Sequence, residues 1–255
     1  MSRYRLNWTI LLIMALYVVS CATANMAVQK QQGEALRNLG EEYYKQGDYT
    51  SALKELLKAQ ALYPDDAFLQ NDLGLTYKAK KRLDLAIKHF KKALDIKPDY
   101  APAKNNLGTV YLDKEEWDTA IKYFKEVSEN MLYATPHIAL ANLGWAYHNK
   151  KEFTLSETYY LKALDLDPKF INAQRGLGLT YIAMGRSSEA KEILEKAVKD
   201  YPKFAPLYDD LAKVYIISHD YEKALDAYHK VIELAPDSGM AREAEKAAQR
   251  IKKRY

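Results

Sequence analysis

The 255-residue sequence contains very little cysteine, since Cys21 is the only one. A single thiol excludes an internal disulfide, and it excludes a zinc site built from paired cysteines. Excess charge is also small, because 38 Lys and Arg residues face 34 Asp and Glu residues, which leaves a formal net charge of +4. Nucleic-acid-binding domains carry a marked basic excess, so this balance gives no electrostatic reason to expect such a partner.

Motifs of catalysis and of cofactor binding are missing as well. The sequence has no H-E-x-x-H, no G-x-S-x-G, no P-loop and no G-x-G-x-x-G. The histidines form no metal-ligand pattern along the chain; they are His89, His137, His148, His219 and His229. We therefore expect no enzymatic activity, no cofactor, no metal site and no small-molecule substrate.

No apolar run is long enough to cross a bilayer. The longest begins at Trp8 and ends at Val19, whereas a membrane-spanning helix needs about 20 residues. Arg3 and Arg5 precede this run, and the combination is typical of a secretory signal. The run ends in Val-Val-Ser-Cys at 18–21, which resembles the lipobox of bacterial lipoproteins.

The lipobox resemblance implies a lipid anchor. In that family the signal is cut before the cysteine, its thiol receives diacylglycerol, and the new amine is acylated. We therefore expect a signal peptide at 1–20 and a lipidated tether at 21–32, with Cys21 as the lipidation site. Two or more acyl chains give stable anchoring. Residue 22 is Ala rather than Asp, which favours the periplasmic face of the outer membrane of a Gram-negative bacterium. The alternative is an ordinary signal peptide that ends in a buried, inert cysteine.

The rest of the chain is organised by a repeated Leu-Gly-x-x-Tyr motif. Its glycines are 34 residues apart, except for 36 between Gly108 and Gly144, and Ala212 replaces the glycine in the last copy. A small residue follows each of these positions by 12 residues, and a large apolar residue comes 4 further on. The large residues are Leu56, Phe90, Phe124, Tyr160, Leu194 and Tyr228.

This period and pattern resemble tetratricopeptide repeats. Each copy carries two apolar runs at helical spacing, and one helix pair cannot bury its apolar stripe alone, so neighbouring pairs must stack. The resemblance implies an all-α, right-handed superhelical solenoid of six repeats with a C-terminal capping helix at 239–255. The expected repeats are 33–66, 67–100, 101–136, 137–170, 171–204 and 205–238.

The third repeat departs from this pattern by two extra residues. We expect the insertion to change the angle between the third and fourth repeats and to expose Met131, Leu132 or Tyr133. Thr135 and Pro136 then suit the N-cap and first position of the next helix.

The repeat family also suggests where a partner binds, because positions 2, 5, 9 and 12 of each first helix line its concave face. Carried onto this chain, these positions predict a groove for a protein partner. Its residues are Phe68, Asn71, Leu75, Asn105, Thr109, Leu112, Trp145, His148, Arg175, Leu179, Ile182 and Ile216, and the same rule adds Lys78, Pro102, Ile138, Ala141, Asn172, Pro206, Asp209 and Lys213. The centre of this groove is apolar and suits an amphipathic helix or an extended peptide. The alternative is a tight superhelix in which these side chains pack on one another.

The lipobox, the tether, the six repeats and the capping helix together resemble the type IV pilus biogenesis lipoproteins of the PilF/PilW kind, which act as pilotins. That resemblance implies an adaptor on the outer membrane that binds secretin subunits of the pilus and helps them assemble. Two alternatives stay open. One is a periplasmic scaffold lipoprotein for peptidoglycan synthesis or outer-membrane assembly, and the other is an enzyme accessory or hydrolase.

Overall fold

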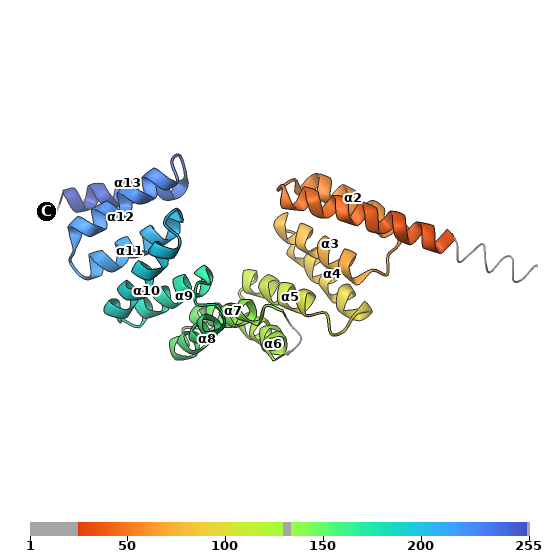
Figure 1. Ribbon diagram of the computed structural model, residues 1–255, viewed down its shortest axis with the longest axis horizontal. Coiled ribbons are helices and arrows are strands. Elements are labelled where there is room, and N and C mark those ends of the chain that lie inside the picture. The colour runs from red at the N-terminus through yellow and green to blue at the C-terminus, as the bar shows by residue number, and fades with distance from the viewer. Residues whose placement is uncertain (1–24, 130–133, 254–255) are drawn as a thin grey trace, which may run out of the picture. The chain divides into compact units, whose positions relative to one another are not determined.

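The computed structural model describes residues 25–129 and 134–253, and every regular element in these ranges is a helix (Figure 1). The predicted all-α repeat fold is therefore confirmed. None of the described helices has the length and apolar character needed to cross a membrane. Cys21, the predicted signal peptide and the Met131–Tyr133 segment lie outside the described residues.

Residues 25–45 form the first described helix, so residues 25–32 of the predicted tether are helical and continuous with the first repeat. The helices that follow run in order along the chain. They are α2 (Tyr49–Leu62), α3 (Ala67–Ala79), α4 (Leu83–Ile96), α5 (Ala101–Asp113), α6 (Trp117–Ser128), α7 (Pro136–Asn149), α8 (Phe153–Leu166), α9 (Ile171–Ala183), α10 (Ser187–Asp200), α11 (Ala205–Ile217), α12 (Tyr221–Leu234) and α13 (Gly239–Lys252).

The chain divides into two compact units, with unit 1 ending at Val110 and unit 2 beginning at Tyr111. Within each unit, consecutive helices pack side by side as antiparallel pairs, such as α3 with α4 and α11 with α12 (Figure 1). The turn inside each pair contains a residue with a left-handed backbone, which reverses the chain in a few residues. Glycine fills this position at Gly47 and Gly185, with φ of 81° and 74°. Other side chains fill it in the remaining pairs, at Lys81, Glu115, Lys151 and His219.

The core of unit 1 depends on glycines that let paired helices approach closely. A Cβ built on Gly74 would lie 2.5 Å from Phe90 Cε1, and one on Gly40 would lie 2.7 Å from Leu56 Cγ. The large apolar residue of the second helix therefore packs directly on the first helix.

A buried polar network accompanies this core. Gln70 is fully buried; its amide donates to the Pro64 carbonyl over 2.8 Å, and its Oε1 lies 2.8 Å from His89 Nδ1. Gln60 Nε2 donates to the same oxygen over 3.4 Å. Burial lowers the pKa of His89 to about 4, so a neutral ring satisfies the glutamine.

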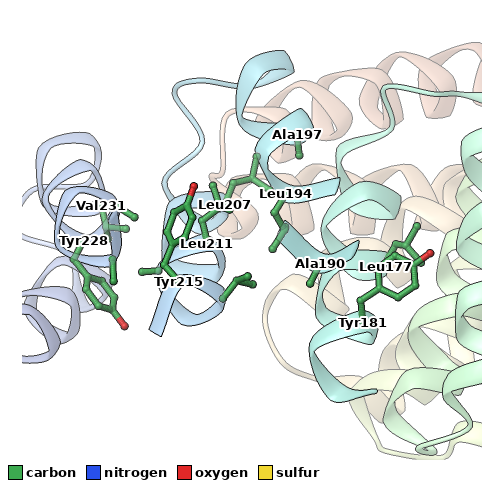
Figure 2. Close-up of a cluster of buried hydrophobic side chains, with 14 of the residues drawn as sticks. Leu177, Tyr181, Ala190, Leu194, Ala197, Leu207, Leu211, Tyr215, Tyr228 and Val231 are labelled. Atoms are coloured by element: carbon green, nitrogen blue, oxygen red, sulfur yellow. The ribbon is translucent and has the colours of Figure 1, made fainter. Parts of the chain in front are cut away.

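The core of unit 2 repeats the same packing through α9 to α12. Figure 2 shows Leu177 and Tyr181 facing Ala190 and Leu194, with Leu207, Leu211 and Tyr215 beyond them. The small residues of α10 are fully buried and let α9 and α11 lie close on either side.

The C-terminal helix α13 closes unit 2 by burying Ala241, Ala244, Ala248 and Ile251. Ser238 caps it, since its hydroxyl accepts from the backbone N–H of Ala241. At the start of α7, Thr135 is the N-cap residue and Pro136 follows, but the threonine hydroxyl makes no capping hydrogen bond.

Candidate functional site

The first helices of the repeats in unit 2 form one face of that unit, which we call the A-helix face of α7, α9 and α11. Between α7 and α9 this face contains a cavity of about 220 Å³, which we call the Trp145 pocket. Its walls are largely apolar. The lining residues are Ile138, Ala141, Asn142 and Trp145 of α7, Tyr160 of α8, Phe170, and Asn172, Arg175, Gly176 and Leu179 of α9.

Gly176 makes room for Tyr160 at the floor of this pocket. Two residues before the signature glycine, the other repeats have Asn38, Asp72, Asn106, Asn142 and Asp210. A Cβ at Gly176 would lie 2.2 Å from Tyr160 Cζ and 2.4 Å from its oxygen. The ring of Tyr160, which comes from the preceding repeat, therefore occupies the space that a side chain at position 176 would need.

Trp145 is 40% exposed at the edge of the pocket, which is unusual for so large an aromatic ring. Its indole stacks on the imidazole of His148, with ring centroids 5.4 Å apart and planes 4° apart. The imidazole also makes an edge-to-face contact with Phe153, with ring centroids 5.5 Å apart. Burial lowers the pKa of His148, so the ring that supports the indole is neutral at physiological pH.

A hydrogen-bond network fixes His148 in turn. Its Nδ1 lies 3.0 Å from the hydroxyl of Thr180, which donates to the Gly176 carbonyl over 2.8 Å. The hydroxyl of Ser156 lies 2.9 Å from that of Thr180 and 2.8 Å from the Gly144 carbonyl. Ser156 and Thr180 are fully buried. This network links α7, α8 and α9 behind the indole and preorganises it for contact with a partner.

The charged groups beside the pocket balance one another. Arg175 Nε donates to Asp210 Oδ2 over 2.5 Å, and this carboxylate is fully buried. Lys213 lies 3.3 Å from the other oxygen of Asp210 and 2.7 Å from Asp209. Two cations thus face two carboxylates, so the region carries no net charge.

The structure brings together only part of the predicted groove in unit 2. Trp145, Arg175 and Leu179 line the pocket, and His148 supports it from behind. Leu112, Ile182 and Ile216 are half-buried and lie outside the pocket lining.

In unit 1 the predicted groove residues lie among polar partners. Phe68 is 47% exposed and meets Tyr100 edge-on at 5.2 Å. Asn71 and Asn105 are only 5% and 8% exposed, so they offer little surface to a partner. Thr109 accepts from Lys78 over 2.7 Å and is half-buried, as is Leu75.

A second cavity, of about 200 Å³, lies in unit 1 at the equivalent place; we call it the Asp72 pocket. It is lined by Glu41, Tyr44, Lys45, Leu56, Asp72, Leu75 and Thr76. Burial raises the pKa of Asp72 to about 7; Glu41 and Asp66 add to this shift, while Arg37 opposes it. The Asp72 carboxyl therefore changes charge near neutral pH.

Sequence reasoning missed Tyr160, Ser156, Gly176 and Asp72. The available signal was the glycine at 176, where the other repeats have Asn or Asp. Among the described residues, no cluster of His, Cys, Asp and Glu could hold a metal ion.

Comparisons with solved structures find the same fold. PilW, described as a widely conserved type IV pilus biogenesis factor, is 23% identical with a TM-score of 0.76, and the match covers 84% of this chain and 98% of PilW. PilF of Pseudomonas aeruginosa is 19% identical with a TM-score of 0.71, covering 86% of this chain and 99% of PilF.

Comparisons of sequence point to the repeat itself. The anaphase-promoting complex subunit 3 of Schizosaccharomyces pombe is 30% identical over 99 residues, which are 39% of this chain but only 15% of that protein. Models of the tetratricopeptide repeat match residues 31–99, 77–131, 138–170, 156–215 and 205–238. Proteins with these repeats are generally adaptors that bind protein partners. The chain belongs to the tetratricopeptide repeat family.

Proposed function

We propose that this protein is an adaptor that binds a polypeptide through the Trp145 pocket of unit 2. The observation that carries the proposal is the exposed indole, which packing and hydrogen bonds hold over an apolar cavity. Rigid aromatic side chains beside a desolvated pocket are the commonest anchors of protein interfaces. Because the walls are apolar, the partner segment contributes apolar side chains, from an amphipathic helix or an extended strand.

We propose further that the partner is a secretin subunit of the type IV pilus and that Cys21 carries the lipid anchor. The protein then acts at the periplasmic face of the outer membrane. The lipobox at 18–21 supports the anchor. The likeness in fold to PilW and PilF over most of this chain supports the pilus role. Confining the pocket to the membrane in which the secretin inserts raises the effective concentration of both partners.

The experiment that tests the binding surface is affinity capture from detergent-solubilised envelopes, comparing the wild-type chain with Trp145→Ala. We expect the variant to lose most of the captured secretin and to keep its thermal stability, since the indole is exposed. Phe204→Ala is the matched control, because Phe204 is 37% exposed and lies outside the pocket lining. Equal capture by Trp145→Ala and wild type would contradict the proposed surface.

The anchor is tested separately by membrane fractionation of Cys21→Ala. We expect the variant to fold normally and to leave the outer-membrane fraction, since acyl chains supply the anchoring free energy. Retention of the variant in that fraction would count against lipidation at Cys21. A captured partner from peptidoglycan synthesis, in place of a secretin, would favour the scaffold alternative.

A further inference from the structure

The floor of the Trp145 pocket contains the hydroxyl group of Tyr160. The Tyr160 side chain is 2% exposed, and its ring lies beneath Gly144 and Gly176. Its hydroxyl makes no hydrogen bond within residues 25–129 and 134–253, is not one of the fully buried polar atoms that lack a partner, and belongs to a side chain that lines the cavity. A hydroxyl that lines a cavity takes its hydrogen-bond partner from water or from a ligand there. A ligand in the pocket can therefore satisfy this one.

The hydroxyl is not required by the fold. At the same position of other repeats, Leu56, Phe90, Phe124 and Leu194 fill the core without any polar atom. Burial raises the pKa of Tyr160 far above its ordinary value, so the group stays protonated at physiological pH and can donate. It therefore calls for a hydrogen-bond acceptor at the bottom of an apolar cavity.

Charge decides which acceptor fits. Asp210 already neutralises Arg175, and Asp209 faces Lys213, so no unbalanced cation remains to offset a carboxylate that leaves water. Burying a charge without such an offset costs far more than burying an amide that is hydrogen-bonded. Asn172, exposed on the pocket wall, supplies an additional amide donor and acceptor.

We propose that the Trp145 pocket takes a single partner side chain with an apolar stem and an uncharged carbonyl tip, namely glutamine or asparagine, whose carbonyl accepts from the Tyr160 hydroxyl. The stem lies between Trp145 and Leu179, and the amide reaches the Tyr160 hydroxyl at the floor of the pocket. This inference rests on the proposed function, because it requires that the pocket binds a polypeptide.

The test is a selection of random-sequence peptides displayed on phage, carried out on the immobilised full chain. On the wild type we expect selected peptides to share one Gln or Asn next to apolar residues. On Tyr160→Phe we expect the apolar preference to remain and the amide preference to disappear. We expect Tyr160→Phe to fold normally, because Phe90 and Phe124 occupy the equivalent core positions. Tyr228→Phe, which removes the equivalent hydroxyl outside the pocket lining, is the matched control.

The affinity of the best peptide selected on the wild type is then measured for the wild type and for each variant. Loss of one net hydrogen bond predicts binding to Tyr160→Phe that is about 5-fold weaker, with no change for Tyr228→Phe. Replacing the peptide amide by a carboxylate, Gln to Glu, predicts a loss of at least about 10-fold on the wild type.

The outcomes separate the two proposals. Enrichment of Asp or Glu, or the same amide preference on Tyr160→Phe, overturns the inference about the floor. If either result occurs and Trp145→Ala still fails to bind the selected peptides, the proposed binding surface is retained. Selected peptides that bind Trp145→Ala as tightly as wild type, or no enrichment on the wild type, overturn both.

Discussion

The two pockets occupy the same place in the repeat and have opposite character. Glu41, Leu56 and Asp72 of unit 1 lie 104 residues before Trp145, Tyr160 and Gly176 of unit 2. In unit 1 the position is filled by a carboxyl group whose pKa is raised to about 7. In unit 2 it is a glycine packed on a tyrosine ring, near an exposed indole.

The comparison shows what the repeat determines and what it leaves free. Small residues and glycines fix how the helices approach, so both units place a cavity between neighbouring first helices. Lining side chains outside the core, such as Glu41 and Trp145, are not needed for that packing, and they can be charged in one unit and apolar in the other. Exchanging them tests this separation directly.

The largest effect is expected for Gly176→Asp, which gives unit 2 the residue of unit 1. Its Cβ would overlap Tyr160 Cζ, which lies 2.2 Å away, so we expect a loss of about 3 kcal/mol in the free energy of unfolding. Unit 1 has Leu56 at the position equivalent to Tyr160. Adding Tyr160→Leu to Gly176→Asp should therefore restore at least about 1 kcal/mol of that loss, because the smaller side chain relieves the overlap. Denaturant unfolding of both single variants and the double variant measures the coupling, and additive losses would show that the contact is not responsible.

The next effect is the pH dependence of unit 1. The unfolded chain releases the Asp72 proton near 3.8, whereas the folded chain holds it up to about 7. The folded state thus binds the extra proton between these values, and its stability falls as pH rises through that window. Asp72→Asn should remove this fall and stabilise the protein at about pH 8 by on the order of 2 kcal/mol. Thermal unfolding between about pH 4 and 8 measures it, and parallel curves for variant and wild type would refute it.

A smaller effect is expected for Ser156→Ala, since the equivalent residue of unit 1 is Ala52. The change removes a fully buried hydroxyl that lies 2.9 Å from Thr180. We expect a loss of about 1 kcal/mol, together with a less ordered Trp145 ring. Unfolding gives the first quantity, and the line width of the indole N–H in NMR spectra gives the second. Thr154→Ala, at an exposed site of the same helix, is a control that should change neither.

The smallest effect concerns the turn that both units share. Lys81 adopts a φ of 59° where the equivalent residue of unit 2 is Gly185, with φ of 74°. A non-glycine residue pays a steric cost in this region, which the greater freedom of glycine in the unfolded chain partly cancels. We expect Lys81→Gly to raise stability by about 0.5 kcal/mol and Gly185→Lys to lower it by about 1 kcal/mol. The denaturant midpoint should rise for Lys81→Gly and fall for Gly185→Lys. Changes in the same direction would exclude backbone strain as the cause.

Sequence periodicity was sufficient to predict the repeat fold, because the Leu-Gly-x-x-Tyr positions are those that pack one helix on its pair. The resemblance to the repeat family also predicted Trp145 as a groove residue, and its indole is exposed beside a pocket. It could not predict Tyr160 as a pocket residue, because the repeat rule assigns that position to the core, and only the contact with Gly176 of the next repeat reveals the hydroxyl.

Hydrogen bonds between repeats escaped the same reasoning. Asn71 was predicted as a groove residue, but its side chain accepts from Asn106 of the next repeat over 2.9 Å and is buried. Gln174 shows the converse case. It is fully buried like Gln70, yet its Oε1 has no hydrogen-bond partner among the described residues, because Ile193 stands where unit 1 has His89. Contacts of this kind depend on the residues at two positions in different repeats. Repeat periodicity assigns a role to each position separately, so it does not predict such a contact.

The first described helix already includes residue 25, which bears on how far the protein can move if Cys21 is acylated. Only residues 21–24 separate the lipid from the first described helical turn. Fully extended, four residues reach about 14 Å, which is shorter than the helix they precede. The anchor would then be a short tether that keeps unit 1 next to the lipid headgroups. A soluble partner would have to approach the bilayer to bind unit 1.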